Sequence, residues 1–151
     1  MCLNYCKNEQ CFVTLSQIFY FQKMDKKKVT AKGLTFETYL TSEEIAKQVN
    51  RVAQEIKNDC GDEAPLFLCV LNGAFVFAAD LFRACDIAGS EMAFIRYKSY
   101  EGMSTTGTVR QVLGLEEDIT GRTVVVIEDI VDTGITAKAL IADLKAKNPK
   151  T

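Results

Sequence analysis

Three carboxylates and two hydroxyls directly follow a strongly apolar stretch of this chain. Thr123-Val-Val-Val-Ile127 leads into Glu128, Asp129 and Asp132, and Thr133-Gly-Ile-Thr136 comes next. Continuous apolar runs of this kind are typical of buried parallel strands. Because open α/β sheets bind ligands at the carboxyl ends of their strands, these acids and hydroxyls are predicted to share one binding site.

The segment from Thr133 to Thr136 has the composition of a phosphate site. It lies where the strand gives way to a predicted helix, and the first N–H groups of a helix lack internal partners. Gly134 lets a ligand approach the backbone closely, and the two threonine hydroxyls add hydrogen-bond donors. The glycine patterns of Walker A loops and of dinucleotide-binding turns do not occur in the sequence.

Glu128 and Asp129 provide hard oxygen ligands beside this segment. Such carboxylates suit Mg²⁺ or the hydroxyls of a sugar. A phosphate, a divalent cation and a polyol together indicate a phosphorylated sugar as the ligand. The chemistry alone leaves a second interpretation open, in which Asp132 caps the helix and the other two acids are solvated loop residues.

The composition narrows the chemistry further. The chain has 151 residues, of which 48% are hydrophobic and 25% charged, and these are ordinary values for one soluble globular domain. It contains no histidine, which excludes a Ser-His-Asp triad, a histidine base and a histidine-ligated zinc. Acid–base chemistry therefore falls to carboxylates, Lys, Tyr or Cys. The formal net charge of -2 argues against a nucleic-acid-binding surface, which is usually basic.

Six cysteines are present, and three of them fall in the first eleven residues. Their spacing matches no common zinc pattern. Cys69 lies in an apolar strand and Cys85 on an apolar helix face, where a thiol serves as a small hydrophobe. We therefore expect reduced thiols and a cytoplasmic protein.

Residues 1–23 are predicted to be an N-terminal extension outside the folded core. They contain the apolar cluster Phe12–Phe21, which has no basic leader or cleavage site and is too short to span a bilayer. A lysine-rich globular sequence follows Met24, so the domain is predicted to occupy residues 24–151. The alternative is a genuine N-terminal strand or a partner-binding segment.

Strands and helices alternate through the rest of the chain. Residues 34–39 alternate as a half-buried strand does, and Thr41 with Glu44 forms a capping-box signature for a helix reaching about residue 58. Further strands are predicted at 66–71, 92–97, 109–113 and 123–127, and further helices at 74–85 and 135–147. Four phenylalanines are core residues by their spacing: Phe75, Phe77, Phe82 and Phe94. The alternation predicts an α/β fold with a mostly parallel sheet flanked by helices on both faces.

Several segments resemble type I phosphoribosyltransferases. Val124–Thr136 is similar to the phosphoribosyl pyrophosphate (PRPP) signature of that family. Val70–Leu81 resembles the pyrophosphate-binding loop and following helix of the hypoxanthine-guanine phosphoribosyltransferases. Phe94–Tyr100 resembles their strand leading into the active-site lid, and Asn148–Lys150 the helix end before their purine-binding portion. The resemblance covers roughly residues 30–151 and implies the type I phosphoribosyltransferase fold.

The resemblance implies roles for the matched acids and for the turn that follows them. Glu128 and Asp129 would hold the ribose hydroxyls of PRPP and help organise Mg²⁺. Asp132 would also belong to the PRPP site, as the general base near the purine's ring nitrogen. The 5′-phosphate would be bound by the backbone and hydroxyl groups of Thr133, Gly134, Ile135 and Thr136.

The same resemblance places two more segments at the leaving group. Asn72 and Gly73 would contact pyrophosphate, where many relatives have Lys-Gly; Asn keeps the backbone contact and removes a positive charge. Ser99 and Tyr100 would belong to the lid that closes over the pyrophosphate.

The implied function is purine salvage. It would consist of Mg²⁺-dependent transfer of the phosphoribosyl group from PRPP to hypoxanthine or guanine, giving IMP or GMP and pyrophosphate. The implied partners are PRPP and a purine base, with no nucleic acid and no membrane, and the full-length protein would be a homo-oligomer. The alternatives are a phosphoribosyltransferase for another base, or a non-catalytic PRPP-sensing regulator that binds nucleic acid.

Relatives continue beyond the segment that resembles Asn148–Lys150 with another core strand and a purine-binding hood. Residues 24–151 are therefore predicted to form an incomplete domain that lacks both. This polypeptide alone is expected to be poorly stable and catalytically feeble or inactive. Without the next strand, Thr123–Ile127 is predicted to be an exposed apolar sheet edge.

Overall fold

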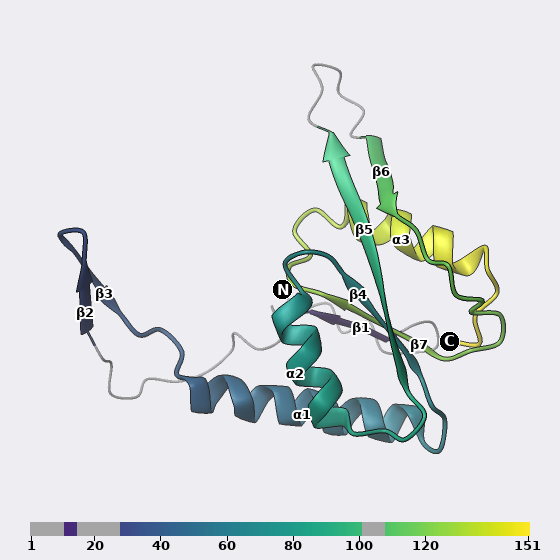
Figure 1. Ribbon diagram of the computed structural model, residues 1–151, viewed down its shortest axis with the longest axis horizontal. Helices are drawn as coiled ribbons and strands as arrows, with labels where there is room; N and C mark the ends of the chain where they lie inside the picture. The colour runs from purple at the N-terminus through teal and green to yellow at the C-terminus, as the bar shows by residue number, and fades with distance from the viewer. Residues whose placement is uncertain (1–10, 15–27, 101–107) are drawn as a thin grey trace.

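The computed structural model describes residues 11–14, 28–100 and 108–151 (Figure 1). Its helices and strands follow one another along the chain as β1 (Cys11–Thr14), β2 (Lys28–Ala31), β3 (Leu34–Glu37), α1 (Ser42–Cys60), β4 (Leu66–Val70), α2 (Phe75–Cys85), β5 (Glu91–Tyr100), β6 (Thr108–Leu113), β7 (Val124–Glu128) and α3 (Ile135–Lys145). From α1 onward, each element predicted from the sequence is present within a few residues of its expected bounds.

The main sheet has five strands in the order β1-β7-β4-β5-β6. β1, β7, β4 and β5 are parallel, and β6 pairs antiparallel with β5. This confirms the predicted α/β class and the mostly parallel sheet. In the β4–β7 pair, Cys69 lies opposite Ile127, so the turns that follow these two strands leave the sheet at the same edge.

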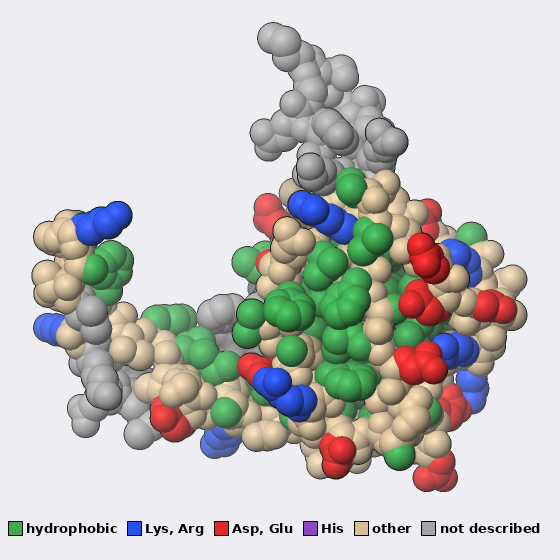
Figure 2. All heavy atoms as spheres, viewed as in Figure 1, with side chains coloured by type: hydrophobic (Ala, Val, Ile, Leu, Met, Phe, Trp, Pro, Cys, Tyr) green, Lys and Arg blue, Asp and Glu red, His purple; other side chains and the backbone are tan. Residues whose placement is uncertain are grey.

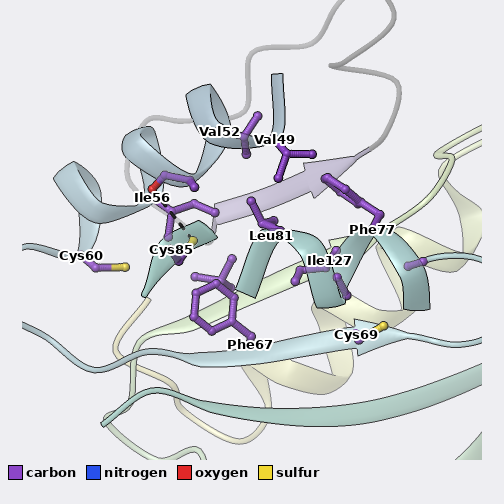
Figure 3. Close-up of a cluster of buried hydrophobic side chains, with 14 residues drawn as sticks. Val49, Val52, Ile56, Cys60, Phe67, Cys69, Phe77, Leu81, Cys85 and Ile127 are labelled. Carbon is purple, nitrogen blue, oxygen red and sulfur yellow. Dashed lines mark hydrogen bonds between the residues drawn. The ribbon is translucent and has the colours of Figure 1, made fainter. Parts of the chain in front are cut away.

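Helices cover both faces of the sheet, as predicted, and the side chains of β4 alternate between the two layers. Phe67 and Cys69 pack with α1 and α2, while Leu66, Leu68 and Val70 pack in a second cluster with Leu140 and Leu144 of α3. Figure 3 shows the first cluster between the two helices and the sheet. All five side chains of β4 are buried, which accounts for its unbroken apolar sequence.

The N-terminus of α1 has the predicted capping box. Glu44 N donates to Thr41 Oγ1 at 3.1 Å, and Thr41 N donates to Glu44 Oε2 at 2.7 Å. These reciprocal bonds satisfy two N–H groups that the helix leaves unpaired. The buried face of α1 carries Val49, Val52, Ala53, Ile56 and Cys60, at the spacing that the sequence indicated.

Two predictions about burial are wrong. β3 forms a two-stranded hairpin with β2 that stands apart from the five-stranded sheet (Figure 1), and all four of its residues are exposed. Phe75 and Phe94 are 53% and 37% exposed, and neither belongs to the two clusters that pack between the helices and the sheet. Figure 2 shows hydrophobic side chains at the surface where α2 and β5 face the viewer.

The outer edge of β7 is occupied by two separate segments. Cys11–Thr14 pair with Val125–Glu128. The C-terminal residues of the chain lie beside the start of β7. Lys150 N donates to Arg122 O at 2.9 Å, and Val124 N donates to Thr151 O at 2.8 Å. The predicted exposed edge is therefore covered along its length. The division of the chain at residue 24 stays a prediction, although β1 comes from the part expected to lie outside the core.

Candidate functional site

The predicted acids and the predicted pyrophosphate loop meet at the carboxyl edge of the sheet. Glu128 ends β7 and Asp129 follows it, and both are half-buried. The turn that contains Asn72 and Gly73 connects the neighbouring strand β4 to α2. Gly73 lies directly against the carboxylate of Asp129, so two segments that the sequence separates widely form one surface.

Burial and the neighbouring Asp129 raise the proton affinity of Glu128. Burial raises its pKa to about 8, and the hydrogen bond and negative charge of the Asp129 side chain add to the shift. Asp129 Oδ1 also accepts a hydrogen bond of 2.8 Å from the backbone N of Ile130. This local bond fixes one oxygen of Asp129 and leaves the other oxygen toward the β4–α2 turn.

The turn before α3 presents backbone N–H groups as the sequence predicted. Gly134 is the N-cap residue, at φ 75°, and no side chain caps the helix. This rules out the interpretation of Asp132 as the capping residue; its side chain is exposed. The first helical bond runs from Lys138 N to Gly134 O at 2.9 Å, so the N–H groups before Lys138 lie outside the helical ladder.

The hydroxyl of Thr133 takes part in this turn. Ile135 N donates to Thr133 Oγ1 at 3.4 Å, a long bond. Thr136 is half-buried and Ile135 is 52% exposed. The turn therefore combines two hydroxyls with helix-start amides that lie outside the helical ladder, beside the acids of β7, which is an arrangement suited to an anion.

The predicted lid residues are the last two of β5. Ser99 pairs with Val109 and Tyr100 with Thr108 of β6, so the hairpin that was predicted around the lid is present. The intervening residues 101–107, which include most of the predicted lid, lie outside the described part of the chain.

The acids fit a divalent cation only together with ligand oxygens. Among residues 11–14, 28–100 and 108–151, no three His, Cys, Asp or Glu side chains cluster as a metal site. Glu128 and Asp129 are two neighbouring hard carboxylates, and the negative charge of Asp129 contributes to the raised pKa of Glu128. Mg²⁺ is usually held by one or two carboxylates, with the remaining positions taken by phosphates and water, so this pair matches that kind of site.

Sequence reasoning missed two contacts that organise this region. Tyr97 of β5 donates from its hydroxyl to Asp143 Oδ2 of α3 at 2.7 Å. Gly73 contacts Asp129, although the two residues are far apart in the sequence. Neither contact leaves a spacing signal, because each joins residues that come together only when the sheet forms. A separate surface hollow, between Phe82 and Ser90, lies at the far end of α2.

Residues 35–151 match the family described as the phosphoribosyl transferase domain. The chain belongs to the phosphoribosyltransferase family. It is 37% identical over 121 residues to the hypoxanthine-guanine phosphoribosyltransferase of Aquifex aeolicus, covering 79% of this chain and 67% of that relative. It is 36% identical to the hypoxanthine-guanine-xanthine phosphoribosyltransferase of Tritrichomonas foetus, covering 71% of this chain and 58% of that relative.

Solved structures give the same family. A hypoxanthine-guanine phosphoribosyltransferase of Bacillus anthracis superposes with a TM-score of 0.66 at 32% identity, over 74% of this chain and 63% of that one. This phosphoribosyltransferase chain thus spans about three fifths to two thirds of the length of these relatives. No helix within the described residues is long and apolar enough to cross a bilayer.

Proposed function

We propose that this chain carries the PRPP-binding part of a purine-salvage phosphoribosyltransferase. The reaction is Mg²⁺-dependent transfer of the phosphoribosyl group from PRPP to hypoxanthine or guanine, giving IMP or GMP and pyrophosphate. The observation that carries the proposal is the meeting of three features at one sheet edge: the acids after β7, the β4–α2 turn and the amide-rich start of α3. The family match and the names of the relatives support it.

Each feature has a chemical task in this reaction. The amides and hydroxyls of Thr133–Thr136 bind the 5′-phosphate at the start of α3. Glu128 and Asp129 bind the ribose hydroxyls and hold Mg²⁺. When bound, the metal neutralises charge on the departing pyrophosphate. The turn with Asn72 and Gly73 lies beside Asp129, where it can contact that group through its backbone.

Loss of pyrophosphate leaves positive charge on the ribose ring, and the carboxylates beside the ring stabilise this charge. Asp132 is exposed at the rim of the site, where it can take the proton released by the purine. A positioned general base contributes typically about 10²–10⁴-fold to the rate. Ser99 and Tyr100 belong to the lid that keeps water away from the reacting carbon. A cytoplasmic location and a homo-oligomeric full-length protein complete the proposal.

The direct experiment is calorimetric titration of the purified chain with PRPP in the presence and absence of Mg²⁺. We expect saturable binding that requires Mg²⁺. Glu128→Gln removes a carboxylate that is charged when it binds the cation, a contact of about 1.5–3 kcal/mol, so it should weaken binding by roughly 10- to 100-fold. Glu117→Gln is the same substitution at an exposed position outside the site and should leave binding unchanged.

Turnover is measured separately, with hypoxanthine and guanine. Binding of PRPP without transfer to either base would support the site and leave the base-specific reaction unsupported. Transfer to a different base would favour the phosphoribosyltransferase alternative. Equal losses in Glu128→Gln and Glu117→Gln, or the absence of PRPP binding to the folded chain, would refute the proposed site.

A further inference from the structure

The contact between Gly73 and Asp129 is the tightest that any described glycine makes. A Cβ placed on Gly73 would lie 1.8 Å from Asp129 Oδ2 and 2.6 Å from Asp129 Cγ. The six other described glycines have no neighbour closer than 3.4 Å to such an atom. Position 73 therefore has no room for a side chain while Asp129 stays where it is.

A positive φ does not explain this glycine. Gly73 is absent from the residues with positive φ, whereas Gly134 and four other glycines have φ between 59° and 77°. Alanine could therefore adopt the backbone angles of position 73 without the strain of the left-handed region. The observed obstacle to a side chain is the carboxylate of Asp129.

Hydrogen bonds on each side hold the carboxylate and the turn in contact. Asp129 is held by the hydrogen bond from Ile130 N to its Oδ1 and by its interaction with the Glu128 side chain. On the other side, Leu71 N donates to Ile95 O at 2.8 Å, and Ala74 is fully buried at the start of α2. The turn is hydrogen-bonded to the sheet at Leu71, the carboxylate is bonded to its own backbone neighbour, and the two meet at Gly73.

We propose that Gly73 is a positioning residue for Asp129. Its missing side chain lets the carboxylate lie against the β4–α2 turn, so that the acid and the turn form one rigid surface. The functional consequence rests on the proposed function. This surface would hold the cation and the pyrophosphate of PRPP next to each other, because one carboxylate oxygen of Asp129 then faces the turn.

The test compares Gly73→Ala with Gly114→Ala. The control position is suitable because the nearest atoms to a Cβ there belong to Gln111, at 3.8 Å, and its φ is not in the left-handed region. The first readout needs no PRPP: the amide NMR shift and hydrogen exchange of Ile130 report the bond to Asp129. We expect both to change in Gly73→Ala and to stay at parent values in Gly114→Ala.

The second readout is PRPP affinity with Mg²⁺. Gly73→Ala should weaken it about tenfold or more, the equivalent of one charged hydrogen bond, and Gly114→Ala should keep it within about twofold. If the parent chain does not bind PRPP, the proposed function fails, while the Ile130 amide still decides whether Gly73 positions Asp129.

A rescue experiment covers loss of folding. In Gly73→Ala/Asp129→Ala the obstructing carboxylate is gone, so the thermal midpoint should return to that of Asp129→Ala alone. Additive losses in the double variant would overturn the proposal, as would an unchanged Ile130 amide in Gly73→Ala. An unfolded Gly73→Ala chain with a folded double variant supports it, and failure of both to fold refutes it.

Discussion

The hydrogen bond from Tyr97 to Asp143 allows a quantitative test of how α3 is held against β5. It joins residues 46 positions apart at 2.7 Å, and α3 begins at the turn that we assign to the 5′-phosphate. Tyr97→Phe removes the hydroxyl and keeps the ring that packs against Leu140 and its neighbours. The variant therefore isolates the bond from the packing.

The expected magnitude follows from the exposure of the two partners. A hydrogen bond to a charged group contributes about 1.5–3 kcal/mol when it is shielded. Asp143 is exposed and Tyr97 half-buried, so water competes for the carboxylate and the value falls to about 1 kcal/mol. For a chain of this size, that loss lowers the thermal midpoint by roughly 2–4 °C.

The assay is a double-mutant cycle of Tyr97→Phe and Asp143→Ala, with free energies of unfolding from urea titration. We expect a coupling energy of about 1 kcal/mol, whereas independent sites add within about 0.3–0.5 kcal/mol. Burial, and then Asp143, raise the pKa of Tyr97 above its ordinary value. A raised pKa means that the stabilisation is complete below the ordinary tyrosine pKa and is lost in strong alkali. A coupling energy near zero at neutral pH would refute this assignment.

Three further predictions concern the rest of the fold. Hydrogen bonds from Lys150 and Thr123 lower the pKa of Glu63. The stability that these bonds give to the fold is therefore present above the ordinary pKa of glutamate and is lost as the pH falls. Glu63→Gln should flatten the acid side of the stability profile, measured by urea unfolding at several pH values. Leu140→Ala removes a fully buried side chain and should cost about 2–5 kcal/mol of unfolding free energy, measured in urea. Burial raises the thiol pKa of three cysteines and should make them react slowly with iodoacetamide in the native chain, measured by mass spectrometry: Cys60, Cys69 and Cys85.

Each of these has its own control. Glu117→Gln should leave the acid side of the profile unchanged, and an identical effect of both glutamate variants would contradict the role of Glu63. Leu113, which is 42% exposed, should tolerate alanine far better than Leu140. The thiols are compared in urea, where labelling should become fast; equally fast labelling of the native chain would show that they are accessible.

The fold could be predicted wherever local chemistry and burial agree. The capping box of Thr41 and Glu44 and the buried strand β4 are examples, since a cap depends on neighbouring residues and a strand buried on both faces is apolar throughout. The alternation in Leu34–Glu37 correctly indicated a strand and wrongly indicated burial. Alternation shows only that a strand has two different faces, whereas burial depends on what packs against them.

The part of the candidate site that lies in one continuous segment could be predicted, and the contact between segments could not. The motif from Glu128 to Thr136 lies in one continuous segment, so its acids and helix-start amides had to be neighbours. The approach of Gly73 to Asp129 depends on β4 and β7 being adjacent and in register. Pairing partners and register are set by the whole sheet, and no local pattern in either segment specifies them.

The arrangement along the outer edge of β7 limits what else can add to this sheet. A strand edge offers one row of donors and acceptors, and here Lys150, Thr151 and β1 use that row end to end. Any further segment laid beside Val125–Glu128, whether from the same polypeptide or from another molecule, must first displace β1. A shortened chain that starts at Met24 would present those amides and carbonyls to its neighbours, and we expect it to assemble edge to edge where the longer chain remains monodisperse.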